Sequence, residues 1–156
     1  MHKFNSLQLV IELAETTREQ MLADLQKFRK SHAYANSQMA QLEQYAAETQ
    51  ERWARNAQLG TAPELLRHHY QFMERLQQAI ALQANVIAGS SRTVQLAEQK
   101  LLQAELRLAS LKLVLTKRLN ALDTQRQRLE QKVTDEFATL QFMKQRRSQM
   151  ENSHGN

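Results

Sequence analysis

Length, composition and charge already exclude several classes of protein. The chain has 156 residues, a formal net charge of +5, three glycines, one proline and no cysteine. Most of its residues favour helix, which predicts long helices rather than a compact globule. Without cysteine there is no disulfide, thiol redox centre or thiolate metal site. No apolar run reaches the roughly 18 residues that span a bilayer, and no signal peptide is present, so we expect a cytoplasmic protein.

The positive charge is concentrated in the last part of the chain. Residues 116–150 contain eight lysine and arginine residues and four acidic residues, an excess of four positive charges. Residues 1–115 are close to balance, with 13 basic and 11 acidic residues. A basic excess attracts acidic proteins, nucleic acid or anionic lipid without distinguishing among them.

A heptad pattern predicts the first helix over residues 6–59. Asn5 and Gln8 have the spacing of a capping box, which marks a helix start. Alternating steps of four and three residues connect 14 positions, eleven of them apolar, as in a coiled coil. We call these positions the seam of this helix: Leu7, Ile11, Ala14, Arg18, Met21, Leu25, Phe28, His32, Ala35, Met39, Leu42, Ala46, Thr49 and Trp53.

One segment has the residues of a turn, and we expect it at 59–63. Gly60 can adopt the left-handed conformation that ends a helix, and Pro63 suits the first turn of the next one. Thr61 and Glu64 have the spacing of a second capping box. The chain is therefore predicted to stop one helix and start another within a few residues.

The second helix, predicted over 62–147, repeats the pattern with twelve apolar residues among 15 positions. Because a short turn joins the two seams, they must pack antiparallel, with partner residue numbers that sum to about 122. This register sets His32 near Ser90 and Trp53 near His69. The seam positions of the second helix are Leu66, His69, Met73, Leu76, Ile80, Gln83, Ile87, Ser90, Val94, Ala97, Leu101, Ala104, Leu108, Leu111 and Leu115.

The predicted fold is all-α: a long antiparallel two-helix coiled-coil hairpin with a C-terminal helical overhang. We expect residues 1–150 to form a single coiled-coil rod and residues 148–156 a disordered tail. Gly89-Ser90-Ser91 is the weak point of the second helix. The heptad phase continues through it, so we expect an unbroken helix; the alternative is a break that produces three helices.

The overhang begins where the second helix extends past the last residue that the first helix can pair with. Past Leu115 the pattern contains a four-residue stutter, which locally unwinds a coiled coil. About 30 residues of basic amphipathic helix then extend without an intramolecular partner. We expect residues 119–145 to be only partly ordered until another protein covers them. The pattern resumes there as Leu119, Leu122, Arg126, Leu129, Val133, Phe137 and Leu140.

No motif indicates catalysis, so we expect a protein that is not an enzyme and takes no cofactor. The chain has no glycine-rich phosphate loop, nucleophile elbow or His-Glu-x-x-His helix. His68 and His69 are neighbours that point in different directions on a helix, which is poor geometry for a metal. A two-helix rod also has no concave site that excludes water. We expect no catalytic, cofactor-binding or metal-binding residues.

Two surfaces remain as candidates for binding. Just after the turn, Met73 and Leu76 lie on the seam, whereas Tyr70 and Phe72 lie off it. Exposed aromatic residues outside the packing face suggest a docking site. The basic overhang could lie on nucleic acid or on a membrane surface. Acidic residues interrupt its charge and aromatic residues are few, so a protein groove or ring is the favoured partner.

Three stretches, taken in order, resemble the FliJ proteins of the bacterial flagellar export apparatus. Leu7–Glu15 resembles the N-terminal helix of that family. Tyr70–Met73, followed by Leu76, resembles its signature after the turn. Gln131-Lys132 with Asp135–Ala138 is similar to its C-terminal motif. The order and spacing of the three stretches along the chain carry the resemblance.

The resemblance implies a non-enzymatic component of flagellar type III protein export, acting in flagellum biogenesis and motility. Such a protein is a coiled-coil stalk that associates with the export ATPase FliI, the membrane gate protein FlhA and export chaperones. It would act in the cytoplasm, at the cytoplasmic face of the inner membrane. Leu140 departs from the family pattern, where a polar or basic residue is more usual.

The resemblance also implies which residues meet which partner. The residues implied for the gate protein are Tyr70, Phe72, Met73 and Leu76. Those implied for the ATPase ring are Arg126, Leu129, Lys132, Val133, Asp135 and Phe137. We expect no nucleic-acid partner and a monomeric hairpin. A generic coiled-coil scaffold, or a stalk of a virulence type III secretion system, would have the same fold and remains an alternative.

Overall fold

Two long helices make up the described part of the chain. The computed structural model describes the backbone of residues 2–155 and the side chains of residues 4–155. Helix α1 spans His2–Ala57 and helix α2 spans Pro63–His154. The two helices pack against each other as a helical hairpin, which confirms the predicted all-α fold.

Both helices extend further at their outer ends than the sequence patterns suggested. Helix α1 starts at His2, so Asn5 lies inside the helix and does not cap it. Helix α2 continues to His154 and stops where Gly155, a common residue after a helix end, follows. Residue 156 lies outside the described part of the chain. The disorder that we expected for residues 148–156 in solution stays a prediction.

The turn between the helices uses the expected glycine and proline but not the expected cap. Gly60 has a φ of 92°, in the left-handed region, and its N–H donates to the carbonyl of Ala57 at 3.3 Å. The first hydrogen bond of helix α2 runs from the N–H of Leu66 to the carbonyl of Ala62, at 3.2 Å. Ala62 rather than Thr61 therefore occupies the N-cap position. Pro63 explains this, because proline favours the first helical position and keeps the preceding residue out of helical conformation.

Contacts divide the chain into two compact units. One unit is Glu12–Leu108, which contains the turn. The other unit joins the described residues up to Ile11 with those from Ala109 onward. The single rod that we predicted for residues 1–150 stays a prediction, and each unit is described by itself.

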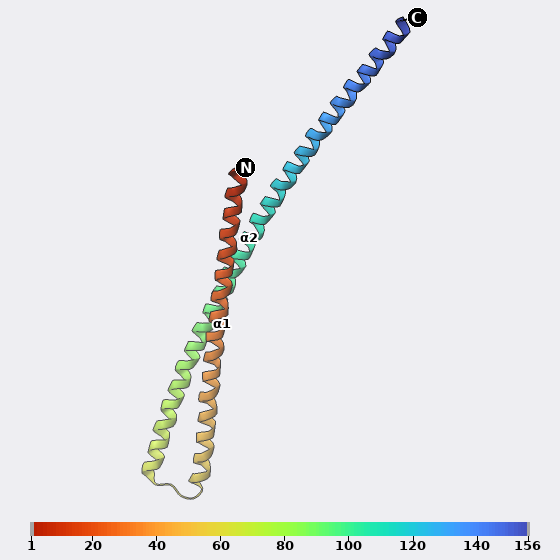
Figure 1. The fold of residues 1–156 in the computed structure, drawn as a ribbon. Helices are drawn as coiled ribbons and strands as arrows, with labels where there is room; N and C mark the ends of the chain where they lie inside the picture. Colours follow the sequence, from red (N-terminus) through yellow and green to blue (C-terminus); the bar gives the residue numbers. More distant parts are fainter. Residues whose placement is uncertain (1, 156) are drawn as a thin grey trace. The chain divides into compact units, whose positions relative to one another are not determined.

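Within Glu12–Leu108, α1 and α2 lie side by side in opposite directions (Figure 1). Two contacts confirm the predicted register. His32 Nδ1 lies 2.7 Å from Ser90 Oγ, within hydrogen-bond distance. The rings of Trp53 and His69 are stacked, with centroids 4.2 Å apart and planes 5° apart. Heptad spacing and the position of one turn were therefore sufficient to align the two helices.

The core of the chain follows the predicted seams. Apart from Leu66, every predicted seam position on both helices is buried or half-buried. Leu25 is the most enclosed of the buried apolar residues, with 2% of its surface exposed. The buried apolar residues are Ile11, Ala14, Leu25, Ala35, Leu76, Ala97, Ala104 and Leu108. All are small or aliphatic, as tight packing between two helices requires.

Polar residues on the seam have two different environments. Ser90 Oγ donates to the carbonyl of Ile87 at 2.9 Å, so it can accept the bond from His32. Gln83 Nε2 donates to the carbonyl of Ala35 at 2.8 Å, which ties the helices together near this layer. By contrast, two buried seam atoms have no hydrogen-bond partner among the described residues: Arg18 Nε and Thr49 Oγ1.

Helix α2 passes through Gly89 without a break, as the heptad phase predicted. In the second unit, Leu7, Leu111 and Leu115 are half-buried. From residue 116 to residue 155, every side chain is exposed. Helix α2 therefore continues well past the last half-buried position, as expected for an overhang.

Candidate partner-binding surfaces

The four residues after the turn differ in their access to a partner. Leu76 is buried, with 8% of its surface exposed, and Met73 is half-buried. Tyr70 is 65% exposed and Phe72 is 40% exposed. Met73 and Leu76 therefore belong to the packing between the helices, as their seam positions predicted. Tyr70 and Phe72 present the accessible surface.

Tyr70 and Phe72 do not form one patch. Phe72 meets Tyr45 of α1 edge to face, with ring centroids 6.0 Å apart. Tyr70 instead lies beside His69, with centroids 5.9 Å apart, and His69 stacks on Trp53. Residues two apart on a helix point about 200° away from each other, since each residue turns the helix by about 100°. The two aromatic residues therefore serve opposite sides of α2.

The pairing of Phe72 with Tyr45 was not anticipated from the sequence. Tyr45 is 47% exposed and lies off the seam of α1. The predicted register, with partner numbers that sum to about 122, sets Tyr45 opposite Gln77 rather than Phe72, so the sequence carried no direct signal for this pair. Together, Tyr45 and Phe72 expose an aromatic pair that bridges both helices.

The residues implied for the ATPase-ring contact all lie on exposed helix, but not on one face. Leu129, Val133 and Phe137 are 59%, 65% and 61% exposed. They follow each other at steps of four, so they share one face of α2 with Arg126. Lys132 lies beside this face. Asp135 points away from it, and its Oδ1 accepts a hydrogen bond from Gln131 Nε2 at 3.1 Å.

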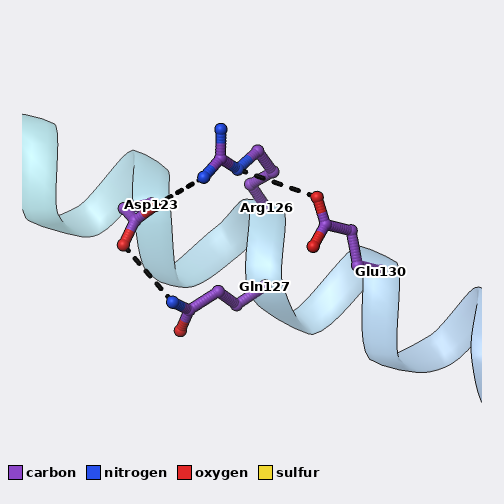
Figure 2. A network of polar contacts seen from close by, with 4 residues as sticks. All are labelled: Asp123, Arg126, Gln127 and Glu130. Carbon is purple, nitrogen blue, oxygen red and sulfur yellow. Dashed lines mark hydrogen bonds and ion pairs between the residues drawn. The ribbon is translucent and has the colours of Figure 1, made fainter.

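Arg126 sits in a small polar network on its own helix (Figure 2). Its Nη2 lies 3.0 Å from Asp123 Oδ1, and its Nε lies 3.8 Å from Glu130 Oε1. Gln127 Nε2 also donates to Asp123 Oδ2, at 3.4 Å. These groups are exposed, so the ion pairs contribute little to stability. They do hold the guanidinium close to the helix.

Neither surface resembles an enclosed binding site. A hollow of about 800 Å³ runs along a single helix between Arg128 and Met143, and every residue lining it is exposed. Such a surface can contact a protein but cannot exclude water from a reaction. Within residues 4–155, no group of three or more histidine, aspartate or glutamate residues is placed to hold a metal ion. Neither helix, over the described residues, has an apolar stretch sufficient to cross a membrane.

Comparison with known proteins identifies the family. A family model described as "Flagellar FliJ protein" matches residues 2–147, which is most of the chain. No curated protein and no solved structure gave a significant match. The matched range includes the hairpin, the segment after the turn and most of the exposed part of α2. The chain therefore belongs to the FliJ family and is a non-enzymatic component of the flagellar export apparatus.

Proposed function

We propose that this chain is a stalk that links the export ATPase ring to the membrane gate protein. The observation that carries the proposal is the exposed end of α2. From residue 116 to residue 155 no side chain is buried, yet the apolar spacing of the seam continues to Leu140. An apolar helix face without a partner is unfavourable in water, so it is expected where another protein completes the packing.

The charge of this segment favours an acidic partner. Its excess of four positive charges over residues 116–150 adds long-range attraction to the apolar contact. We propose that the export ATPase FliI supplies the covering surface, through Arg126, Leu129, Val133 and Phe137. Lys132 would meet the rim of the same contact, whereas Asp135 orders its own helix through Gln131.

We further propose that the gate protein FlhA binds the side of the hairpin that carries Phe72 and Tyr45. Aromatic residues that are partly exposed and already packed against each other lose little conformational freedom on binding, which makes them effective anchors. Met73 and Leu76 support this surface from the seam. Tyr70 lies on the other side of α2. Export chaperones are further partners in this proposal, and the chain would work in the cytoplasm, at the cytoplasmic face of the inner membrane.

Two truncations test the ATPase contact. Truncation after Leu122 removes Arg126 and the apolar residues beyond it but leaves the hairpin, so association with FliI in a pull-down should be lost. Truncation after Arg147 removes only the last residues and is the matched control, which should bind as the full chain does. Binding that survives truncation after Leu122 would show that the ATPase meets another part of the chain.

A scaffold of a virulence type III secretion system would share this architecture. The family match favours the flagellar system. Deletion of the gene should therefore abolish motility, and normal motility would point to the alternative.

A further inference from the structure

The apolar face of α2 continues an interface that already exists in the same unit. Leu111 and Leu115 are half-buried where the described residues up to Ile11 join the segment from Ala109 onward. From there to residue 155 the same face carries only exposed residues. We call the following set the apolar stripe, and its members are 47–65% exposed: Leu119, Leu122, Leu129, Val133, Phe137 and Leu140.

Such a stripe can bind a partner, but it can also promote self-association of the chain. Spacing of three and four residues lets two helices pack together, and a second copy of this chain carries a helix with matching spacing. Self-pairing would hide the stripe from any other protein. A chain that must offer this face to a partner therefore needs a feature that disfavours its own copy.

Arg126 interrupts the stripe midway, between Leu122 and Leu129. Its guanidinium is held by Asp123 at 3.0 Å and by Glu130 at 3.8 Å, all on one helix (Figure 2). The stripe is thus divided into two apolar parts by three charged groups. Their side chains are 54–71% exposed, so water solvates all three in the isolated chain.

Pairing with a second copy would remove that water in every arrangement. In a parallel pair, each Arg126 would face the Arg126 of the other copy across the interface. In an antiparallel pair, each would face either its equivalent or an apolar residue such as Val133. In each arrangement Arg126 and the two carboxylates that hold it lose hydration, and the other copy offers only carboxylates that are already paired with its own Arg126. This cost opposes the gain from apolar burial.

We infer that Arg126 prevents two copies of this chain from pairing through the apolar stripe and so keeps the stripe free for a different protein. A partner that places a carboxylate opposite Arg126 would not incur the same cost. The inference rests on the proposed role of this segment in binding a partner. It adds the residue that discriminates between that partner and the chain itself.

Sedimentation equilibrium of the full-length chain tests the inference. The wild-type protein and Arg126→Lys, which keeps the charge, should remain monomeric at about 50 µM. Arg126→Leu makes the stripe continuous and should strengthen dimerisation at least about tenfold, because a single residue at such a position decides helix pairing. Circular dichroism of each variant checks that helix content is unchanged.

A second variant guards against nonspecific aggregation of a longer stripe. Arg126→Ala removes the charge without adding a large apolar side chain, and it too should dimerise more strongly than wild type. Monomeric Arg126→Leu and Arg126→Ala proteins, or a wild-type protein that dimerises as strongly as they do, would overturn the inference. These measurements use this chain alone. A negative result would therefore overturn the role of Arg126 without bearing on whether FliI binds the stripe. Conversely, a failed FliI pull-down would not change how the dimerisation data are read.

Discussion

Phe72 shows how neighbouring residues on one helix come to have unrelated roles. It is separated from Tyr70 by one residue, yet it contacts Tyr45 of α1 while Tyr70 lies beside His69. The helical rotation of about 100° per residue causes this separation. A partner that binds one of these aromatic residues as an anchor is therefore not expected to contact the other.

This geometry predicts different effects of two similar substitutions. Phe72→Ala removes half of an exposed aromatic pair and should weaken binding to FlhA by at least about tenfold, the loss typical of an interface hot spot. Tyr70→Ala removes a similar ring from the opposite side and is the matched control, which should bind as wild type does. Isothermal titration with the FlhA cytoplasmic region measures both. Equal losses for the two variants, or none for Phe72→Ala, would contradict the proposed surface.

Gly60 and Gly89 have opposite effects on stability, because one ends a helix and the other lies inside one. Gly60 ends α1 with a φ of 92°, a conformation that other residues adopt at a cost. Gly89 lies inside α2, where a Cβ would meet nothing within 4 Å. Gly60 is therefore required by the backbone, whereas Gly89 only weakens the helix.

Replacing each glycine with alanine should shift stability in opposite directions. Gly89→Ala should raise the free energy of unfolding by about 1 kcal/mol, since alanine favours helix interiors over glycine by this amount. Gly60→Ala should lower it by about 1–2 kcal/mol, because a Cβ is strained at positive φ. Urea unfolding followed by circular dichroism compares both with wild type. A destabilising Gly89→Ala would show that the folded chain does not tolerate a Cβ at this position, which would contradict the open space around Gly89.

Stability is distributed unevenly along α2. Seam residues up to Leu115 are buried or half-buried, apart from Leu66 near the turn, whereas every side chain from residue 116 to residue 155 is exposed. Packing of an apolar face provides most of the stability of helices in proteins, because helix propensity alone is marginal. One continuous helix can therefore contain a firmly held part and a part that opens easily.

Hydrogen exchange should reveal this difference within a single helix. Amides of residues 119–145 should exchange at least about tenfold faster than those of residues 94–108, since local opening there exposes no buried surface. The second range is the internal control. Adding FliI should slow exchange in the first range if the ATPase covers it. Equal protection from Leu101 through Leu140 in the isolated chain would contradict the expectation.

The sequence by itself determined the helices, their seams and their alignment. Heptad spacing identifies the buried face of each helix, and one glycine–proline turn sets the register, as the His32–Ser90 and Trp53–His69 contacts confirm. These features depend on residue spacing along the chain, which a sequence contains directly. The all-α hairpin and the exposed basic end of α2 follow from them.

The tertiary structure alone decided which residues off the seam meet and which do not. It joined Phe72 of α2 to Tyr45 of α1 and set the ring of Tyr70 beside that of His69. Contacts beside a seam depend on how two helices cross and on the directions of individual side chains, and spacing along one chain does not contain that information.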